Sequence, residues 1–263
     1  MRIIFNSFQM ENNYRLPENN YHTEKVSYID QPRTRTIAKS FMANVFLLMG
    51  CALAVSGIVA YLFSSNDALR GLLYVPAPNG TLHPSMLAYI AIFSPLVFVL
   101  IMGYGINRLS VLAMGALFGL LSILMGMSLS FIFLVYTDAS IYTCFFSAAG
   151  MFGVMAFMGY TTNKDLTNFG SLLYMALFGV IIASLINFFL HSEQMGYIIG
   201  VISILIFTGI TAYKVQWIKQ MGEGADMADA SSAKLAIYGA MSLYITFINL
   251  FLSLLRVFGG RRR

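Results

Sequence analysis

Seven long runs of apolar residues dominate this sequence, and connectors containing prolines, glycines or charges separate them. A helix needs about 20 apolar residues to cross the hydrocarbon core of a bilayer, and each run approaches or exceeds that length. Such segregation of apolar residues indicates membrane spans. We therefore predict an all-α integral membrane protein, a seven-transmembrane-helix bundle, with spans at about 41–63, 86–104, 110–135, 141–160, 169–190, 195–213 and 233–258.

The composition agrees with this class. Only 10% of the 263 residues are charged, whereas a soluble domain carries about 25%, so the chain cannot cover a water-facing surface. We expect one membrane domain at 34–260, a basic end at 261–263 and no second folded domain. Residues 1–33 are polar and lack periodicity, which predicts a disordered tail. Translation could start at Met1 or Met10, and we expect the first span to be an uncleaved anchor.

Lysine and arginine gather in alternate connectors. Among the odd-numbered connectors only the first holds a basic residue, Arg70, whereas the tail and the even-numbered connectors hold many. Cytoplasmic loops carry this excess, so we predict a cytoplasmic N-terminus. The net charge of +5 has the same explanation, and we expect no nucleic-acid partner. The basic residues of the even-numbered connectors are Arg108, Lys164, Lys214, Lys219 and Lys234.

The C-terminus does not follow this charge pattern. Seven full crossings would place Arg261, Arg262 and Arg263 outside the cell. A short or re-entrant last helix would instead return these arginines to the cytoplasm. The sequence leaves both alternatives open.

Enzyme constellations are missing from the sequence. No His-Glu-x-x-His motif occurs, and the predicted spans contain neither a histidine nor an interior aspartate. We therefore expect no enzyme activity, no cofactor and no metal site. Cys51 and Cys144 lie at different predicted depths, so we interpret them as buried small residues and not as a disulfide.

Ionisable residues within or beside a span are costly and mark candidate functional positions. Lys214 closes the sixth run, Arg108 lies in the short second connector, and Arg256 lies near the end of the seventh run. Each could simply place its charge among the headgroups. Thr211 and Asn249 are polar residues at depth, which could line a pathway or bond across helices.

Three segments of the sequence resemble the Bax inhibitor-1 family, the transmembrane Bax inhibitor motif-containing proteins, and most of all its bacterial members. They are TNKDLTNFGSLLYMALFGVIIASLINFF at 162–189, ISILIFTGITAYKVQWIKQM at 202–221 and MSLYITFINLFLSLLRVFGG at 241–260. The resemblance implies a bundle with the last helix central, surrounded by the other six. It also implies a pH-sensitive leak of Ca²⁺ or H⁺ and a role in stress responses. For a bacterial member it implies the inner (plasma) membrane as the location. Some bacterial members bind and restrain a membrane-anchored ATP-dependent protease.

The sequence departs from the family at the two positions that carry the leak. The resemblance implies two aspartates that share a proton, one after Ala212-Tyr213 and one before the Phe-Ile-Asn element. Lys214 and Thr246 occupy these positions. We therefore expect channel activity to be absent or altered.

Three interpretations follow from this departure. The protein could keep the fold without sensing pH, or Lys214 could act as a fixed plug paired with Asp165 or Glu223. Alternatively, the protein could act mainly as a binding partner, for example of a membrane protease. Arg108 is predicted on the same side as Lys214 and would repel it unless an acid lies between them.

Overall fold

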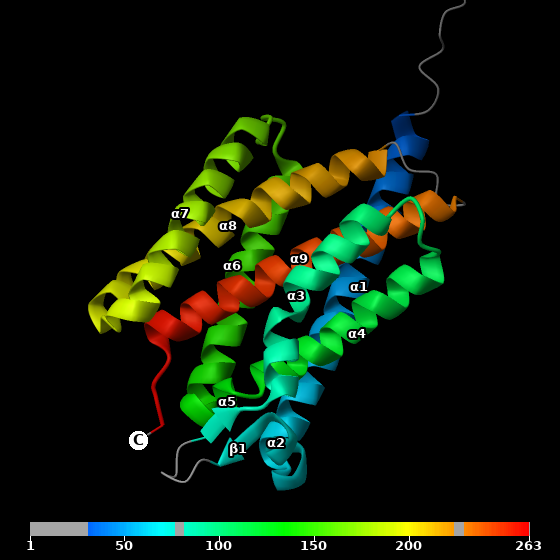
Figure 1. Ribbon diagram of the computed structural model, residues 1–263. Helices are drawn as coiled ribbons and strands as arrows, with labels where there is room; N and C mark the ends of the chain where they lie inside the picture. Colours follow the sequence, from blue (N-terminus) through cyan, green and yellow to red (C-terminus); the bar gives the residue numbers. More distant parts are fainter. Residues whose placement is uncertain (1–30, 77–81, 224–228, 263) are drawn as a thin grey trace, which may run out of the picture.

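The computed structural model describes residues 31–76, 82–223 and 229–262, which are nearly all helical (Figure 1). Within these residues seven helical segments are long and apolar enough to cross a membrane, which confirms the predicted all-α membrane fold. Residues 1–30 of the predicted tail and Arg263 lie outside the described part of the chain. The spanning segments are α1 (Gln31–Ser65), α3 (Met86–Gly105), α4 (Val111–Leu129) with α5 (Ile132–Val135), α6 (Asp138–Thr161), α7 (Thr167–Leu190), α8 (Glu193–Glu223) and α9 (Ala230–Phe258).

The first connector contains the remaining elements, α2 (Asp67–Leu73), β1 (Tyr74–Pro76) and β2 (Leu82–Pro84). The Asn66 side chain accepts a hydrogen bond from the amide of Ala68 at 2.9 Å, which satisfies a free donor at the start of α2. The two strands pair antiparallel, with Val75 opposite His83. Pro76 and Pro84 thus lie at the ends of paired strands in a small cap between α1 and α3.

Three of the predicted spans differ clearly from the helices of the structure. α1 begins at Gln31, whereas the first span was predicted to begin at about residue 41 and residues 31–33 were assigned to the disordered tail. α8 continues to Glu223, whereas the sixth span was predicted to end at residue 213. The third run is divided, because the amide of Ser130 bonds back to Gly126 and Met127 and the chain bends before α5 begins. Hydropathy marks where the chain is apolar, but it does not mark where backbone hydrogen bonding stops.

α9 is the central helix of the bundle. About 67% of its spanning window is buried, the highest share among the spanning segments of the described chain. It packs against α1, α3, α4, α6 and α8 (Figure 1). α7 packs mainly on the outer side of α8, and none of its spanning window is buried. The prediction that the last helix is central is therefore confirmed, although one helix stays peripheral.

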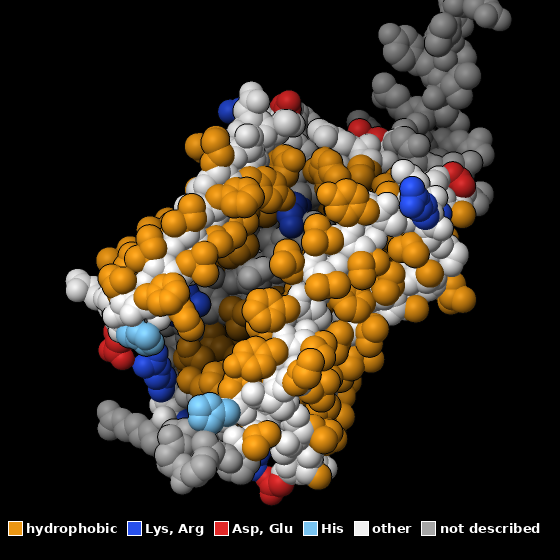
Figure 2. Space-filling model, in the orientation of Figure 1, with side chains coloured by type: hydrophobic (Ala, Val, Ile, Leu, Met, Phe, Trp, Pro, Cys, Tyr) orange, Lys and Arg blue, Asp and Glu red, His pale blue; other side chains and the backbone are white. Residues whose placement is uncertain are grey.

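The outer surface of the bundle is hydrophobic, as a lipid-facing surface requires (Figure 2). Cys144 is buried, but Cys51 is exposed on the outer face of α1, so the prediction that both are buried is wrong for Cys51. A small apolar residue can contact either lipid or protein at little cost, so the sequence pattern does not predict which of the two surrounds it.

Tyr244 joins three helices at the centre of the bundle. Its fully buried hydroxyl lies 2.6 Å from the hydroxyl of Ser56 on α1. Ser56 also donates to the carbonyl oxygen of Ser122 on α4 at 2.8 Å. The ring of Phe118 meets the Tyr244 ring edge-on, with centroids 5.8 Å apart. A buried hydroxyl needs such partners because water does not reach it.

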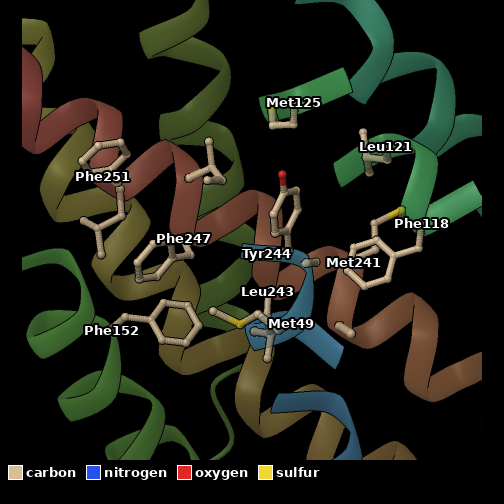
Figure 3. Packing of buried hydrophobic residues seen from close by; sticks show 14 of the residues in the cluster. Met49, Phe118, Leu121, Met125, Phe152, Met241, Leu243, Tyr244, Phe247 and Phe251 are labelled. Atoms are coloured by element: carbon tan, nitrogen blue, oxygen red, sulfur yellow. The ribbon is translucent and has the colours of Figure 1, made fainter. Parts of the chain in front are cut away.

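Aromatic rings fill the space between α9 and α6. The ring of Phe247 on α9 makes an edge-to-face contact with Phe152 at 5.6 Å between ring centres (Figure 3). It meets Phe145 in the same way at 5.4 Å. Phe251, one turn further along α9, meets Phe145 in the same geometry at 5.9 Å. These stacked contacts fix the rotation of α9 about its own axis.

The Ser56–Tyr244 contact is testable through thermal unfolding in detergent. Ser56→Ala leaves the buried hydroxyl of Tyr244 without its partner and should cost about 1–2 kcal/mol. Tyr244→Phe should cost less, because Ser56 keeps its backbone acceptors. The double variant should be no less stable than Ser56→Ala alone, and strictly additive losses would contradict the contact.

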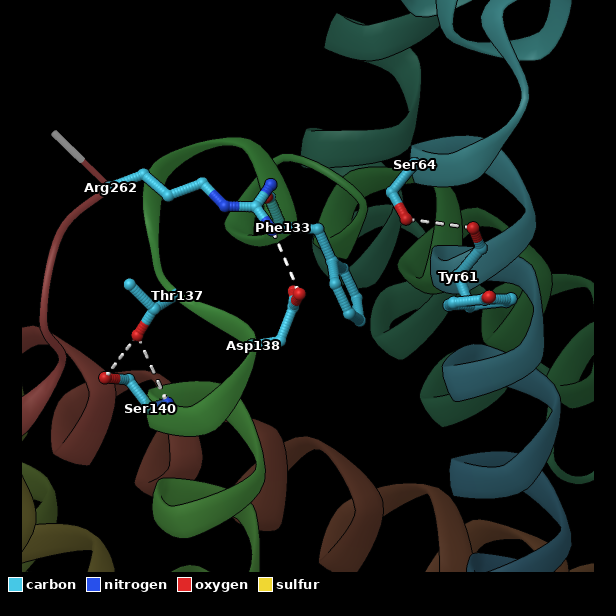
Figure 4. Close-up of polar contacts among 7 residues, drawn as sticks. All are labelled: Tyr61, Ser64, Phe133, Thr137, Asp138, Ser140 and Arg262. Carbon is cyan, nitrogen blue, oxygen red and sulfur yellow. Dashed lines mark hydrogen bonds and ion pairs between the residues drawn. The ribbon is translucent and has the colours of Figure 1, made fainter.

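The residues after α9 are tied to the connector between α5 and α6. The amide of Gly260 donates to the Ser140 hydroxyl at 2.9 Å, and the amide of Thr137 donates to the Gly260 carbonyl oxygen at 3.0 Å. The guanidinium of Arg262 pairs with the Asp138 carboxylate at 3.0 Å (Figure 4). The C-terminal residues therefore lie at the end of the bundle where α5 ends and α6 begins.

A second ion pair locates the same residues relative to α8. Arg261 lies 3.4 Å from Glu193, the first residue of α8. Both contacts belong to odd-numbered connectors, at the end opposite to the start of α1. α9 thus runs as one unbroken helix of 29 residues from the end where α1 begins to the opposite end of the bundle, which favours a full crossing over a short last helix. We call the end with residues 136–138 and 260–262 the C-terminal end, and the end where α1 begins the N-terminal end.

Candidate functional site around Lys214

Lys214 on α8 and Thr246 on α9 are in direct contact. The Lys214 ammonium donates to the Thr246 hydroxyl at 2.9 Å and to the carbonyl oxygen of Ser242 at 3.2 Å. The Thr246 hydroxyl donates in turn to the same carbonyl oxygen at 2.8 Å. The two positions at which the sequence resemblance implies aspartates therefore form one hydrogen-bonded unit across the helices.

This unit contains a cation but no anion. Lys214 is partly buried and Thr246 is buried, yet no ion pair within residues 31–76, 82–223 and 229–262 includes Lys214. Hydroxyl and carbonyl oxygens replace part of the hydration that the ammonium loses. The arrangement can hold a positive charge in place, but it cannot share a proton between carboxylates.

Two glycines bring the neighbouring helices close to α8 beside Lys214. A side-chain carbon at Gly159 of α6 would lie 2.3 Å from the carbonyl oxygen of Ala212. One at Gly170 of α7 would lie 2.4 Å from the Tyr213 ring. Only glycine permits these approaches, so α6 and α7 clamp α8 at the residues that precede the lysine.

Aromatic side chains surround this part of α8. The rings of Tyr213 and Tyr174 stack edge-on at 6.0 Å, and those of Trp217 and Tyr238 at 6.3 Å. Figure 2 shows that this face of the molecule is hollowed between α7–α8 and α3, with basic atoms inside the hollow. The hollow has a largely hydrophobic rim, which disfavours entry of a hydrated ion.

Gln216 is a structural residue of the site that the sequence interpretation missed. Its buried amide donates to the Lys164 carbonyl oxygen at 2.7 Å and accepts from the Leu166 amide at 2.8 Å. These two bonds fasten the connector between α6 and α7 to α8. Residues beyond 213 were predicted to form a loop, and so no role was assigned to Gln216. The lone glutamine beside Trp217 was nevertheless a signal that could have identified it.

Lys219 makes a second contact between α8 and α6 at the N-terminal end. Its ammonium donates to the Tyr160 carbonyl oxygen at 3.0 Å and lies 5.3 Å from the centre of the Tyr160 ring. A cation over an aromatic face is attracted by the ring's electrons. The lysine thus covers the last turn of α6, where backbone carbonyl groups lack helical partners.

The acids considered as partners of Lys214 lie elsewhere. Asp165 is exposed and accepts bonds from the Thr167 hydroxyl at 2.6 Å and amide at 2.9 Å, which lower the pKa of its carboxyl. Glu223 is exposed at the end of α8. Neither forms an ion pair with Lys214 in the described part of the chain, so the plug paired with an acid finds no support in the structure.

The remaining candidate residues do not join the site. Arg108 is exposed between α3 and α4, and Arg256 is exposed near Gly200 towards the C-terminal end. Thr211 and Asn249 bond to carbonyl oxygens of their own helices, at 2.8 Å each. Among the described residues no group of three or more His, Cys, Asp or Glu is placed to hold a metal ion.

The fold and this site define a helical membrane protein of seven spans with a buried last helix. Residues 38–263 match the family model described as "Inhibitor of apoptosis-promoting Bax1". The chain belongs to the Bax inhibitor-1 family.

Curated relatives agree with this assignment. The chain is 42% identical over 235 residues to the inner membrane protein YbhL of Escherichia coli, covering 89% of this chain and 96% of that protein. It is 40% identical to a protein of Caulobacter vibrioides over 85% of this chain and 90% of that protein. It is 34% identical to a membrane protein of Streptococcus pyogenes over 83% of this chain and 92% of that protein.

The role of Gln216 can be tested by proteolysis. Gln216→Leu removes both bonds to the connector and should cost about 1–2 kcal/mol of stability. Trypsin should then cut after the exposed Lys164 faster than in the parent protein, as measured by fragment mass. Gln220→Leu is the matched control, because Gln220 is exposed on the same helix. Equal cleavage in both variants would contradict the role of Gln216 in holding the connector between α6 and α7 against α8.

Proposed function

We propose that this protein is a bacterial inner-membrane member of its family in which a fixed lysine contact replaces the proton-sharing pair and keeps the ion path closed. The observation that carries this proposal is the 2.9 Å hydrogen bond between Lys214 and Thr246. Its N-terminus is cytoplasmic, in keeping with the lysine and arginine pattern. The name of the relative YbhL supports the inner membrane as the location.

Electrostatics oppose calcium at this position. Two unit charges 4 Å apart repel by about 4 kcal/mol at an effective dielectric constant of about 20. A divalent cation doubles this to about 8 kcal/mol, which reduces its occupancy by more than about five orders of magnitude. A charged Lys214 is therefore sufficient to exclude Ca²⁺ from a path between α8 and α9.

The same contact removes the proposed pH response. A pair of close carboxylates changes charge when one proton binds, because both cannot ionise cheaply. The Thr246 hydroxyl does not titrate, and a lysine keeps its charge as the pH falls. The carboxylate pair through which acidification would open or close the path is therefore missing from this contact.

Calcium flux into dye-loaded liposomes tests the proposal. The parent protein should give no flux above protein-free liposomes between pH 6 and pH 8. Lys214→Asp combined with Thr246→Asp restores two facing carboxylates and should produce a flux that varies across that range. Lys164→Asp, which places an acid on the exposed connector at the same end, is the control and should remain silent.

Two outcomes would overturn the closed-path proposal. A parent protein that already conducts Ca²⁺ would show that the lysine does not block the path. A folded double variant that stays silent would show that no path passes this contact.

The second candidate is a non-conducting regulator that binds a membrane partner, such as a membrane-anchored ATP-dependent protease. What favours it is α7, which packs mainly on α8 and leaves the rest of its surface uncovered. The polar residues 1–33 provide a further contact segment on the cytoplasmic side.

Affinity purification from membranes tests this second function. A membrane-anchored protease should be recovered with the full chain and reduced when residues 1–33 are deleted. Recovery that is unchanged by the deletion would assign the contact to the membrane domain. Failure to recover any such protease with the full chain would contradict the regulator.

A further inference from the structure

A lateral pocket opens between α1 and α6 in the half of the bundle nearest the C-terminal end. Both helices pack on α9, but they make little contact with each other. The space between them has a volume of about 470 Å³, within the range of about 300–1,000 Å³ found for small-molecule sites. α9 forms its back wall through Ile248 and Phe251, and α5 closes one end through Phe133.

The mouth of the pocket faces the bilayer. Ile58 is 62% exposed and Phe146 is 70% exposed, and they stand on opposite sides of the opening. Both lie inside spanning segments, where the surrounding medium is lipid and not water. An occupant that enters sideways at this depth must therefore be apolar.

The lining has almost no polar group to offer. Ser56 carries the innermost hydroxyl, which is already bonded to Tyr244, to Ser122 and to the Ala52 carbonyl oxygen. The other lining residues present carbon, apart from the hydroxyls of Tyr61 and Tyr142. A ligand part that needs hydrogen bonds would therefore lose them on entering.

The length of the pocket matches one leaflet. Its α1 wall runs from Leu53 to Leu62, a rise of about 14 Å at 1.5 Å per residue. The hydrocarbon core is about 30 Å thick, so the pocket covers about half of it. One end lies near the Ser56 hydroxyl at the middle of the bundle, and the other lies near the end of α1.

A cation lies at the headgroup end of the pocket. Arg262 donates to the carbonyl oxygen of Phe133 at 3.0 Å and pairs with Asp138, and its side chain is half exposed (Figure 4). The ring of Phe133 in turn meets Tyr61 edge-on at 6.5 Å. A guanidinium has five N–H donors, so further donors remain for a phosphate oxygen.

From the depth, the lining and this cation we infer that the pocket binds one acyl chain of a phospholipid from the leaflet at the C-terminal end. The chain lies along α1 with its methyl end towards Ser56. The headgroup phosphate lies at the level of Arg262. The site is distinct from the Lys214 contact, which lies towards the N-terminal end.

Photocrosslinking in vesicles tests this site. The protein is reconstituted in phosphatidylethanolamine and phosphatidylglycerol with a trace of phosphatidylcholine carrying a diazirine at the end of one acyl chain. After irradiation, labelled peptides are mapped by mass spectrometry. Residues 53–62 and 141–146 should be labelled more strongly than the exposed face of α7, which reports ordinary contact with bulk lipid.

Two glycines of α1 provide a variant and its matched control. Gly57 lines the pocket, and a side chain there would meet nothing within 4 Å, so Gly57→Leu should fill the space without displacing protein. Gly50 is equally open but lies outside the pocket. Gly57→Leu should reduce pocket labelling to the α7 level, whereas Gly50→Leu should leave it unchanged.

The proposal is overturned if the pocket peptides are labelled no more than α7 in the parent protein. It is also overturned if Gly57→Leu, with an unchanged unfolding temperature, keeps the full pocket labelling. If Gly57→Leu unfolds, Ile58→Trp at the mouth gives the same test, because it blocks entry from the lipid side. Retained labelling in that variant would count against the site.

Discussion

The burial of α9 is the constraint on which the rest of the structure depends. A helix surrounded by other helices cannot turn outwards to place a polar group in water, so each polar group on it needs a partner within the protein. α9 meets this need at three levels. Ser242 and Thr246 bind Lys214, Tyr244 binds Ser56, and the residues that follow the helix bind the start of α6.

These three levels involve different neighbours and therefore fix α9 in different ways. The Lys214 contact sets its position relative to α8, and the Tyr244 contact sets it relative to α1 and α4. The C-terminal contacts prevent it from sliding along its axis. A path between α8 and α9 would require movement at the first level, where the lysine supplies both the charge and the hydrogen bonds. The proposal of a closed path thus rests on the same contacts that hold the central helix.

Much of the fold could be predicted from the sequence, because the hydrocarbon core imposes its length on each span. The charge-free third run and the clean alternation of basic connectors left little freedom in the number and order of helices. What hydropathy could not supply was the continuation of a helix beyond its apolar run, as in α8 beyond residue 213. Gln216 was missed for this reason, since its role depends on a helix that carries it against the 164–166 backbone.

The candidate site was predicted less completely. Lys214 was singled out as a charge at the end of a span, and the family resemblance connected it with Thr246. Their contact depends on the packing of two helices, which no local sequence pattern reveals. The proposed acids failed as partners because sharing one side of a membrane does not bring side chains together. The lateral pocket could not be predicted, because it results from a gap between α1 and α6 that no local pattern encodes.

The basic C-terminus illustrates the limit of counting charges. A count of basic residues would place Arg261 and Arg262 in the cytoplasm. In the structure they lie at the end of the bundle opposite to the start of α1. Their partners Glu193 and Asp138 are the first residues of α8 and α6, so the ion pairs exist only after those helices are packed. Solvent-exposed pairs of this kind contribute about 0–1 kcal/mol, which is too little to drive a crossing. The insertion of α9 must therefore be driven by its own apolar surface and by the basic connectors at the N-terminal end, and the arginines are paired once the bundle has closed.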